Sequence, residues 1–153
     1  MLEFETLHHV AISVSDLDRA KRFYGEILGL EEIPRPAFPF DGAWYRIGDQ
    51  EVHLIVSRDP TFRAGKGVTL EDGHFALRVK SYRAALAHLE SKGFRATTDE
   101  PGRSMRANPS SVTGYPQIHI LDPDRNVIEI NAEYVDEPAI PAAACPASPA
   151  RTR

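Results

Sequence analysis

Three histidines and one glutamate stand at positions from which they could share a single divalent metal ion. They are His9, His53, His74 and Glu129, in a chain that holds six histidines in all. Imidazole nitrogens and a carboxylate suit Zn, Ni, Mn or Fe(II). A lone histidine is more simply a core or surface residue satisfied by ordinary hydrogen bonds. The metal hypothesis therefore depends on how the chain places these four residues relative to one another.

Two of the four occupy matching positions in an internal repeat. The segment HVAISV at 9–14 aligns with HFALRV at 74–79, so that His9 matches His74. A turn and a helical pattern follow each segment. Two copies indicate a duplicated supersecondary unit rather than a solenoid, which needs at least three repeats.

The other two lie on the last strand predicted for each repeat. The segment VHLI at 52–55 aligns with IEIN at 128–131, so that His53 matches Glu129. Side chains alternate between the faces of a strand. We expect the apolar neighbours to face the covering helices and the polar residue to face the opposite side. Four polar groups at duplicated positions would then share one cation, which removes the cost of burying each alone.

Hydrophobic periodicity predicts a βαβββ unit in each half of the chain. Ser15 with Asp18 is typical of a helix start, and Gly29 of a helix end. Ser81 and Gly93 bound the second helix in the same way. The expected strands are 8–14, 30–34, 43–47, 51–57, 73–79, 94–97, 116–121 and 126–132. The predicted fold class is α+β, with two tandem βαβββ modules forming an open, cup-shaped mixed β-sheet and the helices outside.

Strand periodicity also sorts the remaining histidines. His8 and His9 are adjacent, so they point to opposite faces, and the repeat selects His9 for the cup. His119 alternates with two isoleucines, which places it on the cup side as well. An imidazole titrates near neutrality, so His119 suits a catalytic acid or base beside Glu129. The alternative is a wall residue without a catalytic role. His88 falls mid-helix and is expected at the surface.

The length and composition of the chain exclude some classes of function. The chain has 153 residues and a formal net charge of −4, which fits one domain and argues against nucleic acid as a partner. We predict a domain at 1–134, with modules at about 5–60 and 70–133, followed by a Pro- and Ala-rich disordered tail at 135–153. The tail holds the single cysteine, Cys145. No signal-peptide pattern or membrane span is found, so we expect a cytoplasmic protein with no membrane partner.

Two loops are predicted to border the cup. Residues 34–44 are rich in Phe, Pro and Trp and offer an apolar wall. Residues 99–116 form a long loop with Arg103 and Arg106, and loops of this length usually act as lids or are disordered. The two arginines suit an anionic substrate, although solvated loop charges are the commoner case.

Three segments resemble a known family. LHHVAISVSDLDRAKRFYGEILGL at 7–30 resembles the opening of vicinal oxygen chelate proteins, which include glyoxalase I, methylmalonyl-CoA epimerase, fosfomycin-resistance enzymes and extradiol dioxygenases. IHILDPDRNVIEI at 118–130 is similar to their D-P-D-G-N-x-x-E strand pair, with Arg125 in place of Gly. The segment 35–55 resembles a glyoxalase-I-like branch, and the whole resemblance covers about 5–133.

The resemblance implies roles for the cup residues. His9, His74 and Glu129 match ligand positions of glyoxalases and fosfomycin enzymes, and Glu129 also matches the catalytic base. His53 falls where glyoxalase I has glutamate and the epimerase has glutamine. His119 falls where a tyrosine contacts substrate in related enzymes. A second carboxylate is thus absent, which makes the site about one unit more positive and Glu129 less basic.

These roles favour a metal-dependent lyase or isomerase of the glyoxalase type. Its small substrate would chelate the metal through vicinal oxygens, and a homodimer is expected. Whether glutathione or another thiol takes part is left open by the sequence. One alternative is a non-haem Fe(II) dioxygenase of the extradiol type, using two histidines and one carboxylate. The other is a protein that binds a small molecule without catalysis, as bleomycin-resistance proteins do.

Overall fold

The computed structural model describes residues 5–57, 67–68 and 73–137. Of the predicted tail at 135–153, residues 138–153 lie outside the described residues, and Cys145 is among them. The first module runs β1 (His9–Val14), α1 (Leu17–Lys21), η1 (Arg22–Ile27), β2 (Glu31–Ile33), β3 (Gly42–Ile47) and β4 (Gln50–Val56). The second runs β5 (His74–Arg78), α2 (Tyr82–Ser91), η3 (Pro101–Arg103), β6 (Met105–Asn108), β7 (Gln117–Leu121) and β8 (Val127–Asn131).

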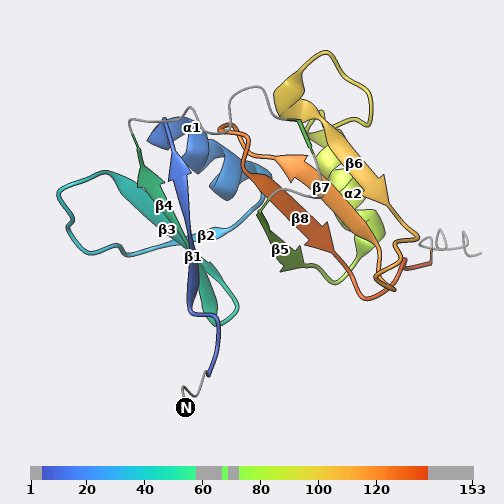
Figure 1. Ribbon diagram of the computed structural model, residues 1–153, viewed down its shortest axis with the longest axis horizontal. Coiled ribbons are helices and arrows are strands. Elements are labelled where there is room, and N and C mark those ends of the chain that lie inside the picture. Colours follow the sequence, from blue (N-terminus) through green and yellow to red (C-terminus); the bar gives the residue numbers. More distant parts are fainter. Residues whose placement is uncertain (1–4, 58–66, 69–72, 138–153) are drawn as a thin grey trace, which may run out of the picture.

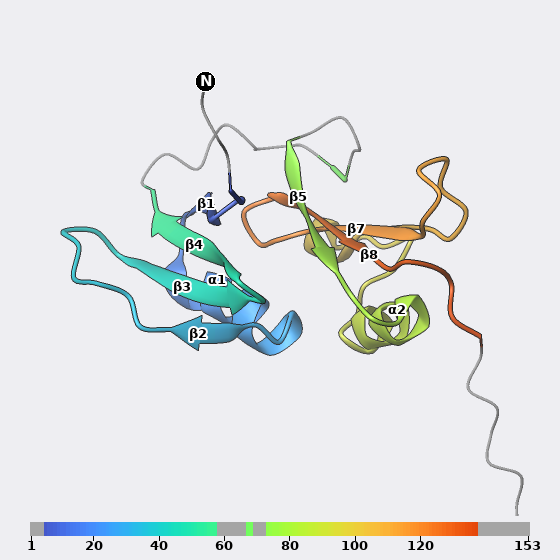
Figure 2. The same ribbon diagram turned by 90° about the horizontal axis from the view of Figure 1, so that it is seen from below.

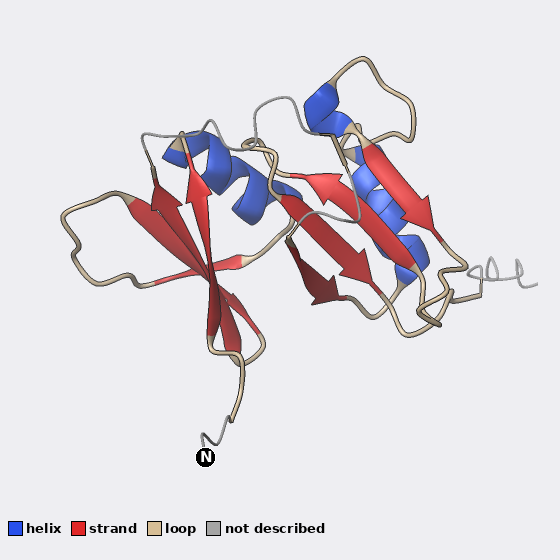
Figure 3. Ribbon diagram, viewed as in Figure 1, coloured by secondary structure: helices blue, strands red, loops and turns tan. Residues whose placement is uncertain are grey.

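The two modules have the same strand order, which confirms the predicted duplication. One four-stranded sheet is ordered β1-β4-β3-β2 and the other β5-β8-β7-β6. In each sheet the first strand pairs in parallel with the last, and the remaining pairs are antiparallel. Both sheets are open, and the helices lie on one side of them (Figures 2 and 3). The fold class is therefore the predicted tandem βαβββ arrangement with helices outside.

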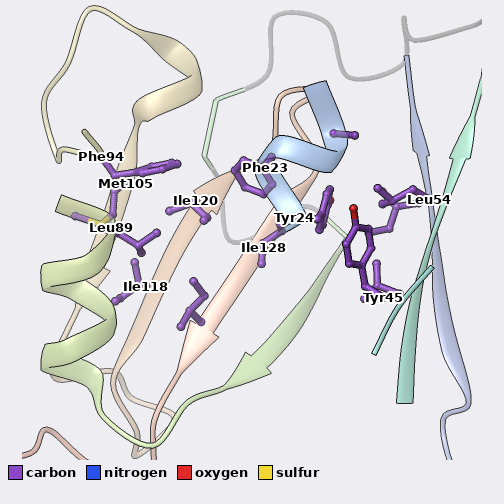
Figure 4. Packing of buried hydrophobic residues seen from close by; sticks show 14 of the residues in the cluster. Phe23, Tyr24, Tyr45, Leu54, Leu89, Phe94, Met105, Ile118, Ile120 and Ile128 are labelled. Carbon is purple, nitrogen blue, oxygen red and sulfur yellow. The ribbon is translucent and has the colours of Figure 1, made fainter. Parts of the chain in front are cut away.

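The hydrophobic core lies between the sheets and the helices. In the second module, Ile118 and Ile120 are fully buried and lie beside Leu89 of α2, and Ile128 is fully buried as well (Figure 4). Tyr45 and Leu54 of the first sheet face Tyr24 of η1 in the same way. The apolar residues of each strand thus alternate toward the helices, as the period-2 pattern predicts. The polar residues between them are left on the helix-free face.

The first helix begins one residue later than predicted, because Ser15 has another partner. Asp16 is the cap, and its carboxylate accepts a hydrogen bond from the backbone N–H of Arg19 at 2.8 Å. The Ser15 hydroxyl instead donates to Asp124. The helix then continues as the π-helix η1 and ends before Gly29, whose φ of 71° lies in the left-handed region. Ser81 caps α2 as expected, accepting from the N–H of Ala84.

The second strand of the second module was predicted in the wrong place. Residues 94–97 form only an isolated bridge, between Arg95 and Ser104, and the strand β6 lies instead inside the predicted loop 99–116. Phe94 is fully buried in the core, so the chain there serves packing rather than pairing. Met105 is also buried and pairs with Ile120, which sets the register of β6.

The turn between β7 and β8 joins the two modules. The carboxylate of Asp122 accepts a hydrogen bond from the Tyr24 hydroxyl at 2.9 Å. The carboxylate of Asp124 accepts from the backbone N–H of Ser15 at 3.1 Å and from the Arg19 guanidinium at 2.9 Å. Arg125, in the position where related turns have glycine, takes a φ of 67°. That conformation costs a non-glycine residue about 1–2 kcal/mol, which explains the usual preference for glycine.

Candidate metal and acid–base site

The helix-free face of the second sheet carries a patch of buried polar side chains. Strand register pairs His119 with Glu129 and Gln117 with Asn131, so the four side chains lie on one face in two adjacent rows. All four are buried, with exposed fractions between 2% for His119 and 8% for Gln117. Buried polar groups are stable only when they find partners. The patch therefore forms a polar network rather than a set of surface residues.

Two imidazoles converge on one oxygen of Glu129. Nε2 of His119 lies 3.2 Å and Nε2 of His74 lies 3.5 Å from Oε2 of Glu129. The donor atoms of these three residues all lie within 4.8 Å of one another. In the part of the chain that the structure describes, no other cluster of at least three His, Cys, Asp or Glu side chains is this close.

The amides beside Glu129 hold it in its ionised form. Burial by itself raises the pKa of Glu129, but hydrogen bonds from Asn131 and Gln117, together with the neighbouring His119 and His74, outweigh it, so the pKa is lowered. Asn131 Nδ2 donates to Oε1 at 2.5 Å. Each hydrogen bond to the charged form favours that form. Glu129 therefore presents Oε2 as an anion toward the histidines while Oε1 is anchored.

His119 is kept neutral by its surroundings. Burial lowers its pKa, and the neighbouring Glu129 only partly opposes that effect. Nε2 faces Glu129, whereas Nδ1 is buried without a hydrogen-bond partner in the described residues. A neutral imidazole keeps one ring nitrogen free of a proton, and this is the form that ligates a metal.

The first sheet carries a column of stacked rings instead of a hydrogen-bonded network. The rings of His9 and His53 stack at 4.2 Å with an interplanar angle of 16°. Trp44 stacks on the other side of His53 at 4.1 Å and 7°. Nε2 of His53 also lies 2.7 Å from Glu51 Oε2, and this hydrogen bond lowers the pKa of Glu51. A carboxylate that orients a histidine in this way is common around metal ligands.

The loop 34–44 extends this column with apolar rings. Phe38 and Phe40 are 43% and 42% exposed, although they stack on each other. Arg35 lies over both rings and donates to the Phe40 carbonyl at 2.8 Å. The expected apolar wall is therefore present, with its aromatic side chains on the surface next to Trp44.

The four predicted ligands fall into two pairs. His74 and Glu129 meet on the second sheet, and His9 and His53 stack on the first. The cluster of close donors includes His119, for which the sequence suggested an acid–base role, and does not include the pair from the first sheet. The exposed side chain of His88 donates from Nε2 to the carbonyl of Ile27 at 2.7 Å, so it connects the modules away from the site.

Sequence reasoning passed over two polar partners, Glu51 and Asn131. Both lie two residues from a predicted ligand on the same strand, Glu51 before His53 and Asn131 after Glu129. Residues two apart share a strand face. That spacing is the signal from which both could have been found.

Comparisons with known proteins agree on the family. A model of the Glyoxalase/Bleomycin resistance protein/Dioxygenase superfamily matches residues 8–113. The chain is 30% identical over 101 residues to the mitochondrial methylmalonyl-CoA epimerase of Homo sapiens, a match that covers 61% of this chain and 57% of the epimerase. The chain thus spans little more than half the length of that relative.

Solved structures show the same fold. A glyoxalase family protein from Enterococcus faecalis superimposes with a TM-score of 0.64 at 25% identity, covering 84% of this chain and 98% of that one. A genomically encoded fosfomycin resistance protein from Listeria monocytogenes gives a TM-score of 0.62 at 17% identity, covering 85% and 94%. Among the helices that the structure describes, none combines the length and apolar character needed to cross a membrane.

Proposed function

Because the chain belongs to the Glyoxalase/Bleomycin resistance protein/Dioxygenase superfamily, we propose that it is a metal-dependent lyase or isomerase of the glyoxalase type. Its substrate would be a small molecule with two vicinal oxygens. The observation that carries the proposal is the convergence of His74 and His119 on Oε2 of Glu129. Two imidazoles and a carboxylate around one point form a donor set for a divalent ion.

The residues present fit a divalent metal. His74, His119 and Glu129 offer three donors within 4.8 Å of one another, and Glu129 is already ionised, as ligation requires. His9 and His53 of the first sheet are the candidates for completing the coordination shell. When bound, the ion would act as a Lewis acid that polarises the substrate's oxygens and stabilises the negative charge that develops on them.

Glu129 is the residue we assign to proton transfer. It would take a proton from the carbon next to a substrate carbonyl and return it to a neighbouring position, so that no atoms are gained or lost overall. Its lowered pKa keeps it ready to accept a proton at neutral pH but makes it a weak base. The substrate carbon must therefore be made acidic by its own carbonyl. His119 would hold the same ion beside Glu129, since its Nε2 lies 3.2 Å from Oε2.

Metal analysis and turnover test this proposal together. The protein should be purified without chelators or a histidine tag and then supplied separately with Ni, Zn, Mn and Fe(II). We expect about one bound ion per chain, and turnover of the methylglyoxal–glutathione adduct or of a related 2-oxo compound. Glu129→Gln should abolish turnover, whereas the distant control His88→Ala should not. Wild-type protein that binds none of these ions would overturn the proposal.

His53→Glu sharpens the assignment to the glyoxalase type. The change supplies the second carboxylate that glyoxalase I has at the matching position and lowers the charge of the site by about one unit. We expect it to raise turnover of the glutathione adduct or to shift the metal preference. An unchanged rate with every metal would place His53 outside the site.

The composition of the cluster favours a second candidate, an Fe(II) dioxygenase. His74, His119 and Glu129 are two histidines and one carboxylate, the set that non-haem iron oxygenases use. Oxygen uptake with Fe(II) and a catechol, recorded with an oxygen electrode, discriminates the two functions. Uptake that requires Glu129 supports the dioxygenase, and its absence beside isomerase turnover supports the first proposal.

A further inference from the structure

Cationic side chains flank the polar patch of the second sheet. Strand register runs one row from Glu129 to His119 and on to Arg106 of β6. The next row pairs Asn131 with Arg78 of β5. Paired residues point to the same face of a sheet. Both arginines therefore lie on the helix-free face with the proposed metal and acid–base residues, one toward each edge of the sheet.

The charge on this face is opposite in sign to that of the chain. The chain as a whole carries a formal charge of −4. On the helix-free face of β5 to β8, Arg78 and Arg106 contribute two positive formal charges and Glu129 one negative formal charge. A divalent ion would make the face still more positive. Such a concentration of positive charge is complementary to an anionic ligand.

The Arg106 side chain is available to bind an anionic ligand. It is exposed, and in the described part of the chain it forms no ion pair, side-chain hydrogen bond or ring contact. It nevertheless lies next to the site, because its position on β6 pairs directly with His119. A guanidinium presents a planar fork of N–H donors that matches a carboxylate. Structural arginines normally use this fork on the protein itself, as Arg19 does with Asp124.

Arg78 is held differently. Its guanidinium lies 5.0 Å from the centre of the Tyr115 ring, in a cation–π contact. Tyr115 lies two residues before Gln117, the β7 member of the row that holds Asn131. This contact places a second positive charge beside the amides that anchor Glu129. On β5 itself, the small residue Ala76 pairs with Glu129.

We propose that Arg106 is the specificity-determining residue of this site and that the substrate is a small organic acid whose carboxylate Arg106 binds. Arg78 adds to the positive field on the opposite side. The inference rests on the proposed function for the role of Glu129, but anion recognition by Arg106 does not require a bound metal.

The test compares a carboxylate probe with its neutral ester. Dissociation constants for pyruvate and methyl pyruvate are measured by NMR titration of the full chain, both metal-free and loaded with Zn. Wild type should prefer pyruvate. Arg106→Ala should reduce that preference about 10- to 100-fold, the equivalent of one charge-assisted hydrogen-bonded pair. Arg106→Lys should lie in between, because it keeps the charge and loses the fork. Arg22→Ala, which removes an exposed arginine from η1 on the helix side, is the matched control.

The outcomes separate this inference from the proposed function. A preference for pyruvate that persists in Arg106→Ala overturns the inference, because the metal or another residue then supplies it. A preference that is lost in Arg106→Ala but kept in Arg22→Ala supports it. Metal content of the same samples tests the proposed function independently. If the protein binds no metal but still shows an Arg106-dependent preference for pyruvate, the inferred anion site stands and the proposed metal-dependent function is overturned.

Discussion

The two modules share one strand order and present different chemistry on the same face. In the second module, hydrogen bonds and close polar contacts converge on a single carboxylate, and Glu129 is 4% exposed. In the first, His53 lies between two parallel rings, and its carboxylate partner Glu51 is about one-quarter exposed. His53 and Glu129 occupy aligned positions, but His53 lies in a column of stacked rings and Glu129 in a buried polar network.

This difference shows how a duplicated fold can divide its tasks. Burial amplifies electrostatic effects, because the low dielectric strengthens each hydrogen bond and penalises each unpaired group. The second module can therefore tune the protonation of His119 and Glu129. The first offers flat, partly exposed surfaces instead, which bind through area and ring stacking. We assign proton chemistry to the second module and ligand packing to the first.

The largest expected effect separates the modules by metal affinity. His74→Ala or Glu129→Ala should weaken binding of Zn or Ni by more than the roughly 10- to 100-fold typical of changes outside the ligand shell. His9→Ala and His53→Ala should also lose metal, but less, because the three close donors remain. Isothermal titration of each variant measures the order. Greater losses from the first-sheet variants would reverse the comparison.

The next effect concerns the junction that holds the modules together. Tyr24→Phe should lower the free energy of unfolding by about 1.5–3 kcal/mol, because it removes a hydrogen bond to the buried carboxylate of Asp122. Tyr45→Phe is the matched control, since its hydroxyl is equally buried and has no hydrogen-bond partner in the described residues. Urea unfolding of both variants provides the measurement. Equal losses would show that the Tyr24–Asp122 bond contributes no special stability.

A smaller effect is expected from the amide that anchors Glu129. Asn131→Ala should weaken metal binding about 10- to 100-fold, because Glu129 loses the hydrogen bond that orients and ionises it. Asn108→Ala removes another amide of the same sheet, one that accepts from the backbone of Ser110 instead. Unchanged affinity in Asn131→Ala would mean that Gln117 and the histidines suffice to hold the carboxylate.

The smallest effect is a change in how stability depends on pH. Burial lowers the pKa of His119, so the unfolded chain binds a proton more readily than the folded one. Stability is then present above the unfolded pKa of about 6.5 and is lost as pH falls below it. Urea unfolding of metal-free His119→Gln should show a shallower loss between about pH 7 and pH 5, near that unfolded pKa. Equal slopes in the variant and in wild type would contradict the assignment.

Local patterns in the sequence determined the elements and the faces of the sheets. The repeat and the alternation of polar with apolar residues placed β1, β4, β5, β7 and β8 within a residue or so of their bounds. The same alternation put His9, His53, His119 and Glu129 on the helix-free side, because the face of a strand depends only on odd or even position. Gly29 and Gly93 marked the helix ends, since both take positive φ.

Only the tertiary structure decided which of these residues meet. Register across separate strands brought His119 opposite Glu129 and Arg106 opposite His119, and the pattern of a single strand carries no information on its partner's register. The Ser15 hydroxyl donates a hydrogen bond to Asp124, 109 residues further along the chain, and Asp16 caps the helix instead. β6 formed where Met105 reached the core. Each outcome depends on distances between segments far apart in sequence, which pairing and packing set together.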